Sequence, residues 1–155
     1  MLRIFSLNSL LIATLLTVGY AKPVMSESTN NLTVIVDGIR NQTGEVCMRI
    51  YSSEKGFPSS SSSEVQSGCT KITGNSIKKV FSNLKPGKYA VAVVDDQNGD
   101  RQLNKDFFGI PTEGFGISRN PIVSMQTGSP KFRNASFLMD KNTTINIVIK
   151  YSLDP

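Results

Sequence analysis

The feature that most constrains the fold of this chain is a period-two alternation of side chains along several short segments. The clearest segments are residues 32–36, 46–51, 89–94 and 145–150. They are rich in β-branched residues, and successive side chains of a strand point to opposite faces of a sheet, so the alternation predicts β-strands. Weaker segments of the same kind are residues 69–73, 77–81, 121–126 and 134–139. Beyond the N-terminus no segment has the spacing of an amphipathic helix, which indicates an all-β fold.

Turn signals separate these predicted strands. Residues 41–44 predict a hairpin between the first two strands. Pro86 and Gly87 suit a type II turn, because proline fixes φ near about −65° and glycine accepts a positive φ. Leu84, this turn and Tyr89 are typical of a tyrosine corner, in which the phenol hydroxyl bonds to nearby backbone. About seven to eight short strands over residues 32–151 predict one antiparallel two-sheet sandwich, a transthyretin-like or immunoglobulin-like Greek key.

The N-terminus predicts export. Arg3 precedes an almost wholly apolar run that ends at Val18, and Ala21 follows at a site suited to signal peptidase. Residues 1–21 are therefore interpreted as a signal peptide, with an alternative cleavage after Ser26, and residues 22–31 as a flexible segment. The apolar run is shorter than the about 20 residues of a spanning helix, so we expect no transmembrane span in the mature form. The expected location is the periplasm or the extracellular space.

Composition narrows the chemistry. The chain of 155 residues has no histidine, which excludes Ser-His-Asp and Cys-His catalysis and imidazole-bound metals. It also has no tryptophan that could stack on a sugar ring. Its two cysteines, Cys47 and Cys69, are expected to form a disulfide in an oxidising compartment. The net charge is +5, but the basic residues are scattered, so we expect no nucleic-acid partner.

A candidate functional segment runs from Asp95 to Asn120. It is long for a loop in a compact domain, and its large apolar residues favour an ordered, Ω-like loop. Its oxygen-bearing side chains at alternating positions resemble the start of a calcium loop, and they are Asp96, Asn98, Asp100 and Asn104. Arg101 and Phe107 replace the glycine and glutamate of an EF-hand, so the loop is not an EF-hand. The alternative interpretation is that the aspartates and asparagines stabilise turns through backbone hydrogen bonds.

Other residues of the segment are candidates for contacting a ligand or partner. They are Asp95, Phe108, Gly109, Pro111, Glu113, Gly114, Phe115 and Ser118. The competing interpretation of Phe108 and Phe115 is packing within the loop itself. Asp100 and Glu113 could form the carboxylate pair of a hydrolase, but Arg101 and Lys105 beside them favour ionised carboxylates over a general acid.

Several of these motifs together resemble a family of secreted bacterial proteins, the domain of unknown function 2141. The motifs are Gly38-Ile39-Arg40-Asn41 with Gly44, Leu84 to Val93, Asp96-x-Asn98-Gly99, Gly109 to Ser118, and a last strand that finishes at Tyr151. The resemblance covers about residues 32–151. It implies an exported β-sandwich similar to transthyretin-like or carbohydrate-binding-like modules, and it implies no activity. The family pattern has a further acidic residue near position 104, where this chain has Asn104.

These patterns predict an exported, non-enzymatic binding or structural module that works through the 95–120 loop. No cofactor is expected. The first alternative is a Ca²⁺-dependent module for carbohydrates or envelope polymers, and the second is a carboxylate-based hydrolase. The expected partner is an envelope or extracellular molecule such as a polysaccharide, and the sequence gives no oligomeric state.

Overall fold

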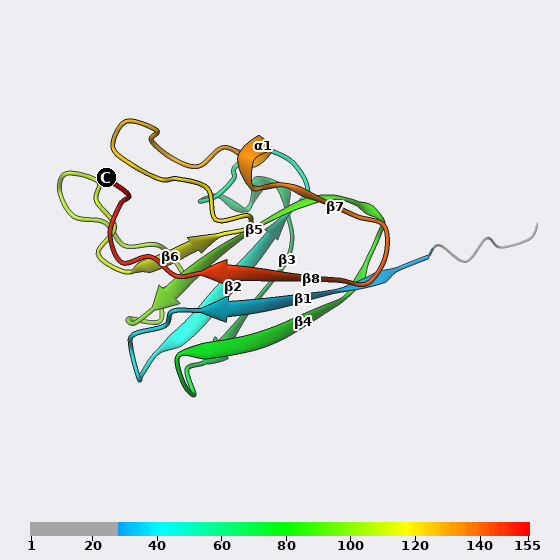
Figure 1. Ribbon diagram of the computed structural model, residues 1–155, viewed down its shortest axis with the longest axis horizontal. Helices are drawn as coiled ribbons and strands as arrows, with labels where there is room; N and C mark the ends of the chain where they lie inside the picture. Colours follow the sequence, from blue (N-terminus) through cyan, green and yellow to red (C-terminus); the bar gives the residue numbers. More distant parts are fainter. Residues whose placement is uncertain (1–27) are drawn as a thin grey trace, which may run out of the picture.

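The alternating segments form strands, and the strands build two sheets that pack face to face (Figure 1). The computed structural model describes residues 28–155. The predicted signal peptide and both of its cleavage sites lie outside the described residues. The first strand begins at Asn30, so the end of the segment predicted to be flexible is already part of a sheet. Within residues 28–155, no helix has the length and apolar character needed to cross a membrane.

The smaller sheet has three strands. Strand β1 (Asn30–Asp37) lies between β4 (Ser76–Leu84) and β8 (Thr143–Val148). The β1–β4 pair is antiparallel, whereas the β1–β8 pair is parallel, with Leu32 opposite Thr143. The prediction of a purely antiparallel sandwich is therefore wrong at this pair, because alternation within a strand carries no information on the direction of its neighbour.

The larger sheet has five strands. Its main order is β3 (Glu64–Lys71), β2 (Glu45–Tyr51), β5 (Gly87–Asp96) and β6 (Gly114–Ile117). The short strand β7 (Phe137–Met139) pairs with the start of β5. Two single-turn helices lie in the connections, a 3₁₀ turn at Ser61–Ser63 and α1 at Phe132–Ala135. The predicted two-sheet sandwich of about seven to eight strands is confirmed, with eight strands.

Strand β5 is buried on both faces. Val91 and Val93 point into the main core between the sheets, together with inward residues of β1 and β2. Ala90 and Ala92 point outward, into a second apolar cluster under α1. Because side chains alternate along a strand, one segment thus serves two layers of the protein.

Two predicted turns differ from those observed. Residues 41–44 connect β1 to β2, but these strands belong to different sheets, so the segment is a crossover and the predicted hairpin is wrong. The predicted type II turn is also wrong, since Gly87 does not have a positive φ. A Cβ on Gly87 would lie 3.4 Å from the ring of Tyr89, which is ordinary van der Waals contact.

The tyrosine corner and the disulfide are confirmed. The hydroxyl of Tyr89 donates to the carbonyl of Lys85 at 2.8 Å. Leu84 is buried at the end of β4 and Pro86 lies in the bend that follows it. Cys47 and Cys69 lie directly opposite each other on β2 and β3 and are bonded.

One strand prediction and one loop prediction near the candidate segment are wrong. Residues 121–126 form no strand and belong to the loop that runs from β6 to α1. Strand β6 lies inside the segment predicted to be a continuous loop, where glycines obscure the alternation. The segment predicted at 134–139 is partly correct, since only its last three residues form β7.

Candidate functional site

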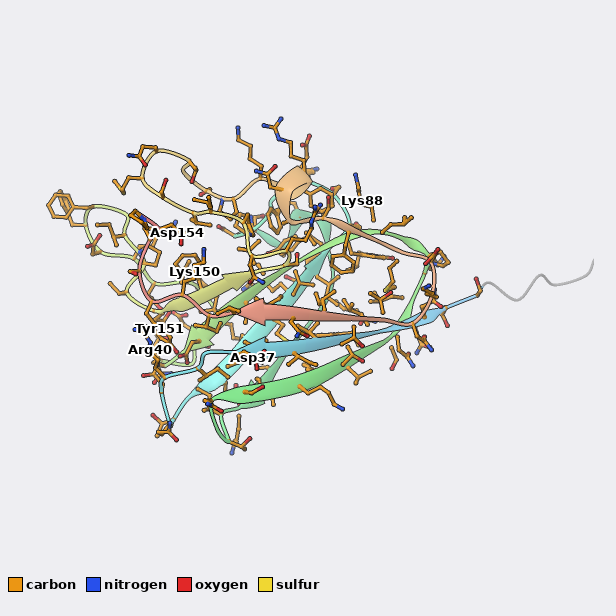
Figure 2. The ribbon with its side chains drawn as sticks, viewed as in Figure 1. Asp37, Arg40, Lys88, Lys150, Tyr151 and Asp154 are labelled. Carbon is orange, nitrogen blue, oxygen red and sulfur yellow. A yellow bond between two sulfur atoms is a disulfide. The ribbon has the colours of Figure 1, made fainter. Side chains whose placement is uncertain are left out.

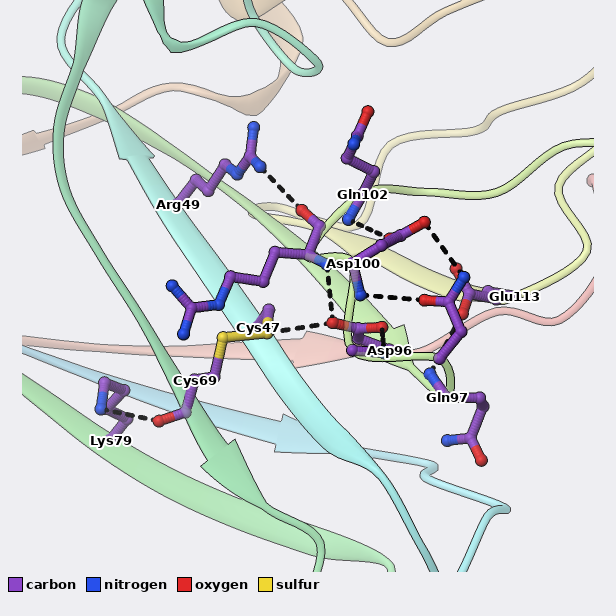
Figure 3. The surroundings of a disulfide bond; sticks show 12 residues. Cys47, Arg49, Cys69, Lys79, Asp96, Gln97, Asp100, Gln102 and Glu113 are labelled. Atoms are coloured by element: carbon purple, nitrogen blue, oxygen red, sulfur yellow. Dashed lines mark hydrogen bonds between the residues drawn. A yellow bond between two sulfur atoms is a disulfide. The ribbon is translucent and has the colours of Figure 1, made fainter.

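The site begins where β5 ends, at two consecutive buried aspartates. The carboxylate of Asp96 accepts hydrogen bonds from the backbone N–H groups of Gly99 (2.7 Å) and Arg101 (2.8 Å). It also lies 3.7 Å from Cys47 Sγ, a contact without a proton because that sulfur belongs to the disulfide (Figure 3). Asp96 therefore fixes the turn that leads out of β5.

Asp95 points to the opposite side of the strand. Its carboxylate accepts hydrogen bonds from the side chains of Asn41 (2.8 Å) and Gln97 (2.6 Å), and from the hydroxyl of Tyr151. These donors come from the crossover after β1, from the loop itself and from the C-terminal segment. Asp95 thus holds three parts of the chain together and is not free to contact a ligand.

Three polar side chains meet on the exposed part of the loop. Asp100 Oδ2 accepts hydrogen bonds from the amides of Asn98 and Asn104, both at 3.0 Å. Asp100 Oδ1 accepts from the N–H of Gln102 at 2.8 Å, and this bond is the largest cause of a lowered pKa of Asp100. Of the four candidate calcium ligands, the structure brings these three together, whereas Asp96 is committed to the backbone of its turn.

Glu113 closes the base of the loop. Its two carboxylate oxygens accept hydrogen bonds from the N–H groups of Gln97 (3.0 Å) and Asn104 (3.1 Å). Within residues 28–155, the group of acidic and cysteine side chains close enough to share a metal is Glu45, Cys47 and Cys69, and the disulfide occupies both sulfurs. The described carboxylates of the loop thus act as backbone acceptors, as the turn interpretation predicts.

The tip of the loop presents two phenylalanines to solvent. Asp106 Oδ1 accepts hydrogen bonds from the N–H groups of Phe108 and Ile110, both at 2.9 Å, which fixes the turn. Phe107 and Phe108 are 96% and 77% exposed and pack edge to face against each other. The expectation that the large apolar residues pack the loop is wrong for these two. It holds for Phe115, which is buried on β6.

The glycines of β6 allow close packing on its inner face. A Cβ on Gly114 would lie 2.7 Å from both Ile149 and Tyr151, and one on Gly116 would lie 2.6 Å from Ile147. Ser118, just after the strand, is buried and donates to the carbonyl of Ala135 at 2.7 Å. Gly114 and Ser118 therefore support the fold and do not reach a ligand.

The outer face of the same strands forms the floor of a pocket of about 470 Å³, which we call the outer pocket. Its floor consists of outward-facing side chains from β2, β5 and β6, and these are Cys47, Arg49, Ala92, Val94, Phe115 and Ile117. One wall is the 97–113 loop, through Leu103, Phe108, Gly109 and Pro111. The other is the loop after β6, through Val123, Met125 and Pro130. Figure 1 shows these two loops, yellow-green and yellow-orange, projecting on the same side of the molecule.

The second wall is fastened by the C-terminal segment. The carboxylate of Asp154 accepts hydrogen bonds from the N–H of Val123 (2.7 Å) and from Lys150 Nζ (2.5 Å), and these bonds, that of Lys150 first, lower the pKa of Asp154. Lys150 also donates to the carbonyl of Pro121 at 3.2 Å. Figure 2 shows Lys150 and Asp154 beside each other at this end of the molecule. Both walls of the outer pocket are thus anchored through side-chain carboxylates.

The charged residues that line the outer pocket are all basic. They are Arg49, Arg101 and Lys105. Arg49 donates to the carbonyl of Arg101 at 2.7 Å and lies 3.7 Å from a carboxylate oxygen of Glu64. Arg101 and Lys105 are exposed at the mouth. Of the eight predicted contact residues, four line this pocket, namely Phe108, Gly109, Pro111 and Phe115.

Apart from Phe115, the floor of the pocket is the part that the sequence analysis missed. Ala92 and Val94 were assigned to the predicted strand at residues 89–94 and to no site. The signal was present, because the apolar run from Tyr89 to Val94 is continuous, and such a run is typical of a strand covered on both faces. Val123 and Met125 have no comparable signal, since they come from a loop that follows a different strand.

Comparison with known proteins gives one result. The model of a family described as an uncharacterised protein conserved in bacteria, domain of unknown function 2141, matches residues 34–146. No curated protein and no solved structure matches the chain.

Proposed function

This chain belongs to that bacterial family, and from this premise we propose that it is an exported, non-enzymatic binding module whose ligand occupies the outer pocket. The observation that carries the proposal is the pocket itself. Its volume of about 470 Å³ falls in the range of about 300–1,000 Å³ typical of small-molecule sites. Its lining combines an apolar floor with a few polar groups, which is also typical of such sites.

The acidic residues favour binding over hydrolysis. A glycosidase general acid needs a raised pKa, whereas the pKa of Asp100 is lowered by its hydrogen bonds. Both carboxylate oxygens of Glu113 accept hydrogen bonds from backbone N–H groups at the base of the loop. Among residues 28–155, those that line the outer pocket include no carboxylate. A pocket without an acid or a histidine favours a ligand that is held and released unchanged.

Export is supported by the disulfide. The Cys47–Cys69 bond is of a kind that persists mainly in oxidising compartments, such as the periplasm or the extracellular space. In that setting the ligand would be an envelope or extracellular molecule. The proposal therefore keeps the working surface predicted from the sequence, the 95–120 loop, and places its ligand against the sheet beneath that loop.

The test uses a neutral apolar dye, N-phenyl-1-naphthylamine, whose emission rises in a dry site. We expect the mature protein to enhance the emission. Val94→Phe should abolish the enhancement, because Val94 lies in the floor between Cys47 and Phe115 and a larger ring would fill the space. The matched control is Val80→Phe, which adds the same ring on the exposed outer face of the other sheet.

The outcomes separate clearly. Enhancement by the parent and by Val80→Phe, with loss in Val94→Phe at an unchanged melting temperature, supports the proposal. If Val94→Phe binds the dye as well as Val80→Phe does, the outer pocket is not the binding site and the proposal fails.

A second candidate function is calcium-dependent binding of a carbohydrate or envelope polymer. The observation that favours it is the meeting of Asn98, Asp100 and Asn104 on an exposed turn, since carboxylate and amide oxygens suit Ca²⁺. Both amides direct their NH2 groups at Asp100, so binding of Ca²⁺ would require them to turn their oxygens inward. Under this alternative, millimolar Ca²⁺ raises the melting temperature relative to a chelator, because a ligand of the native state stabilises it. Asp100→Asn should remove the shift, and Asp140→Asn, an exposed control, should keep it. An identical melting temperature with Ca²⁺ and with chelator would reject this alternative.

A further inference from the structure

We propose that the outer pocket takes a single-chain amphiphile with an anionic head group. This inference rests on the proposed binding function and names the class of its ligand. Three features carry it: the apolar floor, the basic mouth and the two exposed apolar residues at the rim.

The floor suits a hydrocarbon chain. Its central residues are Ala92, Val94 and Ile117, with Phe115 beside them, and none of these side chains offers a hydrogen-bond donor or acceptor. Burying a hydrocarbon chain here removes apolar surface of the ligand from water, and on the protein side mainly that of the half-buried Val94, since the other floor residues are already buried. The volume of about 470 Å³ lies toward the lower end of the range for small-molecule sites, which favours one chain over a multi-chain lipid.

The mouth suits an anion. Arg101 and Lys105 line it, and among the described residues no hydrogen bond or ion pair engages either side-chain cation. The nearby carboxylates of Asp100 and Asp106 accept backbone hydrogen bonds within their own turns, and neither residue lines the pocket. The pocket thus presents positive charge without a matching acid, which favours an anionic head group and disfavours a cationic one.

The rim suits the part of the ligand where its head group joins its hydrocarbon chain. Phe108 on one wall and Met125 on the other are 77% and 70% exposed, although both line the pocket. Each comes from a different loop, and each loop is anchored, at Asp106 and at Asp154 respectively. A chain that enters between them would cover apolar surface that the unliganded protein leaves in water.

The experiment measures displacement of N-phenyl-1-naphthylamine by two amphiphiles with the same nine-carbon alkyl tail. Decanoate is anionic and nonyltrimethylammonium is cationic. We expect decanoate to displace the dye at a concentration about three- to tenfold lower, the scale of one or two partly exposed ion pairs. The double variant Arg101→Gln with Lys105→Gln should remove that preference while still binding the dye.

The matched control removes two charges elsewhere. Lys88→Gln with Lys141→Gln changes the net charge equally at exposed positions that do not line the pocket, and it should keep the preference (Figure 2 labels Lys88). Equal displacement by both amphiphiles overturns this inference while dye binding leaves the proposed function intact. Absence of dye binding overturns both. A last test sediments the protein with phosphatidylglycerol vesicles. If the protein binds the vesicles and decanoate does not release it, the two phenylalanines at the loop tip bind a membrane surface and the inference is overturned.

Discussion

The phenol hydroxyl of Tyr151 donates a hydrogen bond to the carboxylate of Asp95, which lies 56 residues earlier at the end of β5. The same hydroxyl accepts a hydrogen bond from the N–H of Arg40 at 2.8 Å. The guanidinium of Arg40 lies 4.8 Å from the centre of the Tyr151 ring, and Figure 2 shows the two residues side by side. One side chain therefore joins the C-terminal segment to β5 of the larger sheet and to the crossover that follows β1 of the smaller sheet.

Tyr151→Phe should destabilise the protein by about 1–3 kcal/mol, because it removes a donor from a buried carboxylate and an acceptor from a backbone N–H. Chemical denaturation of the parent and the variant measures the difference. The control is Tyr89→Phe. It loses only a hydrogen bond to a carbonyl, so its free energy of unfolding should fall by less. A Tyr151→Phe variant as stable as the parent would contradict the assigned role.

Stability should fall at alkaline pH. Burial raises the pKa of Tyr51 and of Tyr151 above the ordinary value of about 10. Above that value the unfolded phenols lose protons that the folded phenols retain, so the unfolded state binds fewer protons and the free energy of unfolding decreases as pH rises. Below it, the contribution is fully present.

The comparison of Tyr151→Phe with the parent isolates the part due to Tyr151. The gap in stability between the two should narrow from about pH 8 to about pH 11. Urea denaturation at both values measures the gap, and titration of the lysines affects both proteins alike. A gap that widens with pH would contradict the raised pKa of Tyr151.

Gly116→Ala should cost about 1–3 kcal/mol, the usual range for overpacking a core. The new Cβ would lie 2.6 Å from Cγ2 of Ile147 on the facing strand. Gly74→Ala is the matched control, since a Cβ there meets nothing within 4 Å, and it should change stability by less than about 0.5 kcal/mol. Combined with Ile147→Ala, the Gly116→Ala change should cost less than the sum of the two single changes, because the clashing methyl group is gone.

The paired change Cys47→Ala with Cys69→Ala should lower the free energy of unfolding by about 3 kcal/mol, the chain-entropy value for a 22-residue separation. Reductant should lower the free energy of unfolding of the parent by a similar amount and leave that of the double variant unchanged. Thiol labelling provides the independent check. Labelling of both cysteines in the folded, non-reduced protein would contradict the disulfide.

The sequence predicts the sandwich well because its alternation is local. The pattern at 89–94 is sufficient to predict β5, and two cysteines in a chain with a predicted signal peptide are sufficient to predict their bond. Strand direction depends on residues that are far apart, so the parallel pairing of Leu32 with Thr143 could not be read from either segment alone. Strand β6 was missed because two of its four residues are glycines, chosen for the close approach of Ile147 and Ile149.

The long acidic segment that the sequence singles out forms one wall of the outer pocket, and Phe108 and Phe115 line that pocket. The carboxylates attract attention in a sequence because they are charged, yet Asp96 and Glu113 act as acceptors for nearby N–H groups. The floor includes Ala92 and Val94 of β5. Their continuous apolar run indicates burial on both faces, but it does not show that β2 and β6 lie beside them to complete the floor.

The parallel pair of β1 and β8 also bears on when the protein can finish folding. Strand β1 is the central strand of its sheet, and the partner on one side is the last strand of the chain. A ribosome, or a channel that passes the chain from its N-terminus, releases β1 early and residues 143–148 late. One edge of β1 must therefore wait, unpaired, for nearly the whole length of the chain to emerge, and loops that long close slowly. The small sheet consequently cannot be completed until residues 143–148 have emerged.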